Sequence, residues 1–202
     1  MRFDEIIRAR GPLIIVDTET GGLDPQRHSL LSVAFVSIDG ARRVELFVRE
    51  PSLVTNPESM KVNGIDLEMI EREGLSPQEA CERLDRFLEG ELERAGGKGA
   101  LLIGHNVAFD LAFLKRLYRL AGREGDHPLI SHRSLDTHTL LWALAALGQI
   151  PAAACGSDGA FKHYGVSPPE ELRHTALGDA VATQELLVKL MTELSEALRS
   201  EA

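Results

Sequence analysis

A short apolar run near the start of the chain, Leu13-Ile14-Ile15-Val16, limits most strongly what this sequence can fold into. It follows Gly11-Pro12, and three of its four residues are β-branched. Short apolar runs that are rich in β-branched residues and bounded by turn residues are typical of fully buried strands. We therefore expect this segment to form a strand in the interior of a sheet.

Further apolar segments predict the rest of the sheet. Residues 30–38 and 44–48 predict two more strands, and Asp39-Gly40 between them signals a turn, which favours an antiparallel meander of the first three strands. A fourth and a fifth strand are predicted at residues 101–103 and 134–136.

Helices are predicted mainly in the second half of the chain. Ser76, followed by Pro77 and Glu79, predicts a helix start with a capping box, and Gly96-Gly97 predicts the end of that helix. Further helices are expected at residues 106–121, 137–147, 160–164 and 175–198. Three strands followed by alternating helices and strands predict an α/β domain with a mixed five-stranded sheet flanked by helices.

Length and composition predict a single globular domain, residues 1–202. The chain has 44% hydrophobic and 26% charged residues, which suits a soluble protein with one sizeable core. No apolar run approaches the roughly 18 residues of a membrane span, and the N-terminal residues do not resemble a signal peptide. We expect a cytoplasmic protein without membrane contact. Cys81 and Cys155 make no disulfide framework, so we expect small buried side chains at both positions.

Two carboxylates follow the first strand as Asp17-Thr18-Glu19. Residues i and i+2 of a strand point to the same face, so both carboxylates can converge on one site. Ligands of open α/β sheets tend to bind at this end of the strands. The pattern alone is weak, because it occurs again as Asp66-Leu67-Glu68 in a polar stretch that we interpret as solvated surface.

Two later segments carry further candidate residues. In His105–Asp110, Asn106 suits an N-cap, and Asp110 in the first helical turn would favour the helix dipole. In His174–Asp179, the acid lies near the start of the closing helix, and the histidine precedes it by five residues. Taken singly, each segment is explained as well by helix capping or by ordinary surface charge.

Taken together, the three segments resemble the DEDDh group of exonucleases, which includes bacterial proofreading subunits, ribonuclease T and oligoribonuclease. The matching segments are Val16–Leu23, Gly104–Asp110 and Arg173–Asp179, and the resemblance covers nearly the whole chain. It implies an RNase H-like fold and a 3′→5′ exonuclease that releases nucleoside 5′-monophosphates from single-stranded DNA or RNA.

The resemblance assigns catalysis to four acids and one histidine: Asp17, Glu19, Asp110, Asp179 and His174. It implies that the acids bind two divalent metal ions. Four crowded carboxylates repel one another unless cations neutralise them, and oxygen ligands suit Mg²⁺ or Mn²⁺. Two such ions roughly 4 Å apart can stabilise both oxygens of a phosphodiester displacement. His174 would be the general base, because an imidazole pKa near 6.5 suits that task at neutral pH.

The resemblance also predicts contacts with the terminal nucleotide, by Thr20, Leu23, Asn63, Asn106 and Phe109. Core packing is an equal explanation for Phe109. For Asp136 we expect an N-cap, with support of the site as the alternative.

Two departures from the group stand out. Many relatives carry Glu in the second strand where this chain has Ser32, which puts support of the metal ligands in doubt. Ribonuclease T-like enzymes grip bases with aromatic residues, whereas this chain has Leu23, Val62 and Ser134 at the matching places. Their base preference therefore does not carry over.

Charge limits how the chain can hold its partner, a single-stranded 3′ end. A net charge of −9 argues against a broad basic face, although an enzyme that holds a strand end through metal ions needs fewer cations. Four bases on the helix after Asp110 form either a solvated face or a phosphate-tracking ridge: Lys115, Arg116, Arg119 and Arg123. A polymerase-binding proofreading subunit, a homodimer and a non-catalytic binding module are the other arrangements we consider.

Overall fold

The computed structural model describes residue 5, residues 10–125, residues 127–168, residue 172 and residues 175–200. Its five strands form one sheet in the order β3-β2-β1-β4-β5, and the pairs β3/β2 and β2/β1 are antiparallel, whereas β1/β4 and β4/β5 are parallel. The strands are β1 (Leu13–Thr20), β2 (Leu30–Ser37), β3 (Arg43–Phe47), β4 (Ala100–Gly104) and β5 (Ile130–Asp136). The predicted mixed α/β sheet is thus confirmed.

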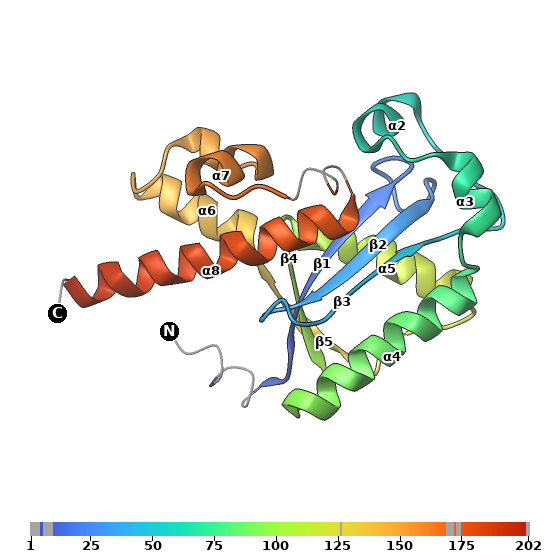
Figure 1. Ribbon diagram of the computed structural model, residues 1–202, viewed down its shortest axis with the longest axis horizontal. Coiled ribbons are helices and arrows are strands. Elements are labelled where there is room, and N and C mark those ends of the chain that lie inside the picture. Colours follow the sequence, from blue (N-terminus) through green and yellow to red (C-terminus); the bar gives the residue numbers. More distant parts are fainter. Residues whose placement is uncertain (1–4, 6–9, 126, 169–171, 173–174, 201–202) are drawn as a thin grey trace.

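Helices cover both faces of this sheet (Figure 1). They are α2 (Pro57–Asn63), α3 (Leu67–Glu73), α4 (Pro77–Ala95), α5 (Val107–Leu120), α6 (Thr137–Ala146), η1 (Ala152–Ala154), α7 (Ser157–Tyr164) and α8 (Ala176–Ser200). The capping box at the start of α4 is present as predicted, with Ser76 and Glu79 each accepting a backbone hydrogen bond from the other. None of the helices in the described part of the chain is long and apolar enough to span a bilayer.

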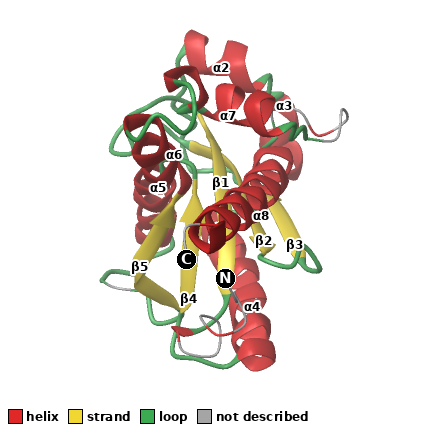
Figure 2. Ribbon diagram, turned by 90° about the vertical axis from the view of Figure 1, so that its left-hand side faces the viewer, coloured by secondary structure: helices red, strands yellow, loops and turns green. Residues whose placement is uncertain are grey.

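Successive side chains of the central strands point to opposite faces of the sheet. Even-numbered residues of β1 such as Ile14 pack with α4 and α5, whereas odd-numbered ones such as Ile15 pack with α8. One side of α8 therefore covers this face of the sheet, and another side of the same helix packs with α6 and α7 in a separate cluster. Figure 2 shows α2, α6 and α7 near the end of the sheet toward which β1 points.

The central strand is longer than its apolar run predicts, because β1 extends to Thr20. It pairs with β2 along this length, but its pairing with β4 covers only Leu13 to Ile15. The last residues of β1 thus have a paired neighbour on one side only. Asp17 and Glu19 lie in this half-open stretch, inside the strand and not after it.

The two short helices α2 and α3 were not predicted. Both have clear start signals, since Asn56 accepts a hydrogen bond from the Ser59 amide and Asp66 accepts one from the Glu68 amide. Each has seven residues and buries only one, so neither shows an apolar period. Asp66 and Glu68 are exposed, which agrees with our interpretation of the second Asp-x-Glu pair as surface.

Candidate active site

Three of the predicted catalytic carboxylates meet at the half-open end of β1. Asp17 and Glu19 project from the face of β1 that α8 covers, and Asp179 lies in the first turn of α8. Each of the three offers an oxygen, and these oxygens lie within 4.8 Å of one another. All three side chains are half-buried.

The fourth carboxylate, Asp110, approaches from the opposite face of the sheet. It lies in the first turn of α5, where only 3% of it is exposed. The hydroxyl of the buried Thr18 donates a hydrogen bond of 2.7 Å to Asp110 Oδ1. Because Thr18 stands between Asp17 and Glu19, this bond ties α5 to the strand that carries both acids.

Burial and mutual repulsion raise the pKa of these carboxyl groups. Burial is the largest cause for Asp17, whose pKa lies well above its usual value and is raised further by the charges of Asp110 and Asp179. Burial, Asp179 and Glu45 raise the pKa of Glu19 to about 8. Burial also raises the pKa of Asp110 to about 7, although the Thr18 hydrogen bond opposes it. A cation at this site would relieve the repulsion.

The donor set fits a hard divalent cation. In the part of the chain that the structure describes, only Asp17, Glu19 and Asp179 form a cluster of three metal-binding side chains, and all their donors are carboxylate oxygens. Mg²⁺ and Mn²⁺ favour such ligands, whereas Zn²⁺ sites are usually rich in His or Cys. Asp110 is close enough for its charge to act on Asp17, which makes it a further ligand candidate.

The junction of β4 with α5 has an unusual backbone conformation. Asn106 has φ 64° and ψ 47°, the one positive φ of a non-glycine residue in the described segments. It occupies the N-cap position of α5 as predicted, but its side chain makes no capping hydrogen bond. The backbone amide of Asn106 donates a hydrogen bond of 2.7 Å to Asp136 Oδ1. Asn is among the few residues that adopt this conformation readily.

Asp136 joins the two neighbouring strand ends. It caps α6 as predicted by accepting from the His138 amide, and the same oxygen holds Asn106. Burial raises the pKa of Asp136, but hydrogen bonds from Thr139, Asn106 and His138 outweigh burial and leave it below its usual value. The predicted cap is therefore confirmed, and the same residue also holds the loop before α5.

The start of α8 is closely packed. The Thr175 hydroxyl accepts a hydrogen bond from the Gly178 amide at 3.0 Å and donates one to the Leu172 carbonyl. A Cβ at Gly178 would collide with that same carbonyl oxygen, which explains why glycine precedes Asp179. His174, the predicted general base, lies outside the described residues.

The predicted nucleotide-binding residues differ in their exposure to solvent. Leu23 is 79% exposed and Asn106 is exposed, whereas Thr20 and Asn63 are buried. The Asn63 amide group donates to the Thr20 carbonyl, so this side chain braces the end of β1. Phe109 is half-buried against the core, with its ring centroid 4.9 Å from that of Phe113, which is the packing role considered for it.

For the four bases on and just after α5 we considered either a solvated face or a phosphate-tracking ridge, and two of the four pair with acids elsewhere in the fold. Arg116 binds both oxygens of the buried Glu50 carboxylate, at 2.8 and 2.7 Å, and also donates to backbone carbonyls of the loop after β1. Arg123 pairs with Asp85 of α4. Of these four bases, only Lys115 and Arg119 are exposed and have no partner among the described residues. No local pattern predicts this difference, because both partners lie far away in the chain.

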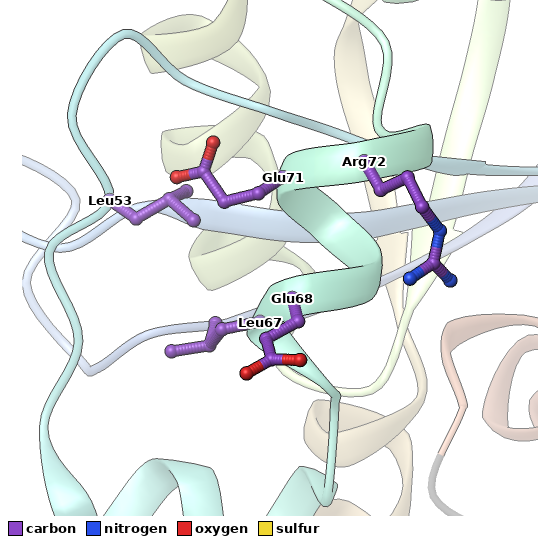
Figure 3. Close-up of a pocket in the computed structure, with 5 residues that line it drawn as sticks. All are labelled: Leu53, Leu67, Glu68, Glu71 and Arg72. Atoms are coloured by element: carbon purple, nitrogen blue, oxygen red, sulfur yellow. The ribbon is translucent and has the colours of Figure 1, made fainter.

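A hollow of about 510 Å³ lies beside α3 (Figure 3). It is lined by Leu53 and by one side of α3, namely Leu67, Glu68, Glu71 and Arg72. None of the predicted catalytic or nucleotide-binding residues lines it, so it is separate from the candidate active site.

Glu45 is a carboxylate near the site that the sequence analysis missed. It lies on β3, and its charge is one of the causes that raise the pKa of both Asp17 and Glu19. Its position in an ordinary alternating strand carried no signal, since only the pairing of β3 with β2 brings it near the two acids.

Several known proteins are similar to this chain in sequence or structure. A family model described as an exonuclease matches residues 14–187. The chain is 35% identical over 189 residues to a DNA polymerase III subunit epsilon-like protein of Rhodobacter capsulatus, in an alignment that covers 90% of the chain but 24% of that protein. It is 27% identical over 191 residues to ribonuclease T of Blochmanniella pennsylvanica, which covers 89% of the chain and 84% of the relative.

Among solved structures, exonuclease I of E. coli in complex with a dT13 oligonucleotide is similar, with a TM-score of 0.73 and 15% identity. The match covers 94% of this chain and 43% of that protein. At this identity the likeness concerns the fold, which is RNase H-like, as the sequence resemblance implied.

Proposed function

Because the chain belongs to the exonuclease family whose model matches residues 14–187, we propose that it is a metal-dependent 3′→5′ exonuclease of the DEDDh type. It hydrolyses phosphodiester bonds at the 3′ end of single-stranded DNA or RNA and releases nucleoside 5′-monophosphates. The observation that carries this proposal is the convergence of Asp17, Glu19 and Asp179 within 4.8 Å at the end of the central strand.

The proposed roles follow from position and chemistry. Asp17, Glu19, Asp110 and Asp179 hold two Mg²⁺ or Mn²⁺ ions, which supply charge stabilisation for the attacking and leaving oxygens when they are bound. His174 takes the proton of the attacking water, a role that the sequence resemblance assigns to it. Leu23 and Asn106, both exposed, face the terminal nucleotide together with the backbone around Thr20, and Asn63 and Phe109 support this surface.

The direct test compares oligonucleotides labelled at either end. With Mg²⁺, a 5′-labelled single strand should shorten one nucleotide at a time, and a 3′-labelled strand should release labelled mononucleotide at once. A 3′-phosphate should block the reaction, and chelation should abolish it. First release of 5′ label, or full activity in excess chelator, would contradict the proposal.

Two substitutions connect this activity with the site. Asp17→Asn and Asp179→Asn should each reduce turnover nearly to background. Glu68→Gln is the matched control, because Glu68 belongs to the exposed second Asp-x-Glu pair and should leave turnover unchanged. If the parent protein itself showed no turnover, and the three variants did not differ from it, the chain would be a non-catalytic binding module. Matched DNA, RNA and di- to pentanucleotide substrates then determine the preferred substrate.

A second candidate function is a proofreading or accessory subunit of a polymerase. It is favoured by the 35% identity to an epsilon-like protein, of which this chain spans 24%. Such a subunit should remove a mismatched 3′ nucleotide faster when a polymerase occupies the same primer end. Equal rates of nucleotide removal with and without polymerase would indicate that the chain acts as an independent exonuclease.

A further inference from the structure

Glu45 lies in line with the metal-site acids across three strands. Asp17 of β1 pairs with Ala34 of β2, and Ala34 pairs with Glu45 of β3. Directly paired residues lie on the same face, so these three side chains form a row on the face that α8 covers. Ala34 is fully buried and small, and therefore leaves room between the two acids.

The Glu45 carboxylate connects the sheet to the start of α8. Its Oε1 accepts a hydrogen bond of 3.2 Å from the backbone amide of Leu177, a residue 132 positions later. Leu177 is the second residue of α8, where backbone amides have no partner within the helix. A negative charge at this place also favours the helix dipole.

Two other amides of this first turn are held from within the segment. The Thr175 hydroxyl accepts from Gly178, and the Thr175 carbonyl accepts from Asp179. Glu45 thus provides a hydrogen bond from the sheet to this turn, two residues before the carboxylate that completes the cluster with Asp17 and Glu19.

We propose that Glu45 is a positioning residue, which anchors the first turn of α8 to the sheet and thereby places Asp179 against Asp17 and Glu19. The proposal rests on the proposed function, since it treats these acids as the metal site of an exonuclease. It goes beyond that function because it assigns a role to a residue outside the family's catalytic set.

Ser32 explains how Glu45 is held. The Ser32 hydroxyl donates to the same Oε1 of Glu45 at 3.3 Å, and Ser32 pairs directly with Glu19. At the position where the family resemblance led us to expect a glutamate, this chain has a serine that binds a glutamate of the third strand. In this chain β3 thus supplies a carboxylate close to the site.

Two substitutions distinguish the hydrogen bond between Glu45 and Leu177 from the negative charge of Glu45. Glu45→Ala removes both, whereas Glu45→Gln keeps an oxygen that can accept from Leu177 and removes only the charge. Glu89→Ala, an exposed glutamate of α4, is the matched control. Residues that orient metal ligands typically contribute 10–100-fold to metal affinity or activity. We expect Glu45→Ala to lower kcat and Mn²⁺ affinity by about tenfold or more, with KM for the oligonucleotide nearly unchanged, and Glu45→Gln to retain most of both.

A second measurement reports on the anchor without any activity. Hydrogen exchange at the Leu177 amide should be faster in Glu45→Ala than in the parent and close to the parent in Glu45→Gln. Unchanged exchange in Glu45→Ala, or equal damage to kcat by Gln and Ala, would overturn the proposal. If the parent chain showed no nuclease activity, the proposed function would fail, while Leu177 exchange would still decide whether Glu45 anchors α8.

Discussion

Glu19→Gln should stabilise the metal-free protein at alkaline pH, although it removes a proposed metal ligand. The folded protein raises the pKa of Glu19 from 4.5 to about 8, through burial and the charges of Asp179 and Glu45. As pH rises from 4.5 to about 8, the unfolded chain therefore loses this proton while the folded chain retains it. Stability of the metal-free protein should fall across this window, because the folded state binds more protons.

The size of the effect follows from the same values. Each tenfold change in proton affinity corresponds to about 1.4 kcal/mol, so ionising Glu19 in the folded protein costs up to about 5 kcal/mol above pH 8. Glutamine carries no charge and should remove this loss. Below about pH 4.5 the parent and the variant should differ little through this effect, because Glu19 is protonated in both states.

Urea unfolding in the presence of chelator, at several pH values between 4.5 and 9, measures the free energy directly. The parent and the control Glu68→Gln should lose stability as pH rises, and Glu19→Gln should lose clearly less. Adding Mn²⁺ at pH 9 should raise the free energy of unfolding of the parent protein, because ligand binding stabilises the folded state by mass action. The increase should be smaller for Glu19→Gln, which lacks one proposed ligand. Equal pH dependence in Glu19→Gln and Glu68→Gln would refute the reasoning that buried, crowded charge defines this site.

Three further predictions concern residues around the site. His174→Ala should lower kcat by about 10²–10⁴-fold and leave Mn²⁺ binding intact, whereas a loss of binding like that of a ligand variant would exclude a general-base role. Replacing Lys115 and Arg119 together with Ala should reduce the salt slope of single-strand binding by about 1.4 if both contact phosphates, and an unchanged slope would make them ordinary surface charges. Arg116→Ala should lower the free energy of unfolding in urea by about 3–5 kcal/mol, because it leaves the buried Glu50 carboxylate without its cationic partner. A loss below about 1 kcal/mol would show that this pair is not structural.

Local signals in the sequence were enough for much of the fold. The buried run at Leu13 predicted the central strand, and the capping box at Ser76 predicted the start of α4 to the residue. Asp136 was predicted as a cap and is one. Each of these features depends on neighbouring residues alone, through alternation, helix period or hydrogen bonds within one turn. Helices α2 and α3 were not predicted because they are short and bury little, so cap residues at their ends and Pro57 at the start of α2 were their only signals.

The carboxylates of the site could be selected from the sequence because three short segments together resemble one family, although each segment alone was ambiguous. Asp17 and Glu19 share a strand face, and Asp110 and Asp179 each lie in a first helical turn. That Asp17, Glu19 and Asp179 come within 4.8 Å of one another is a property of the packed sheet and helices.

Only the tertiary structure decided which distant residues become partners. Arg116 and Lys115 are adjacent bases in the sequence, yet one is locked to Glu50 and the other is exposed. Glu45 sits in an unremarkable strand, and it reaches Leu177 only because β3 pairs with β2 in one register and α8 crosses that face. The period of a segment determines which way its own side chains point. What they meet there depends on strand register and helix packing, which bring together residues more than a hundred positions apart.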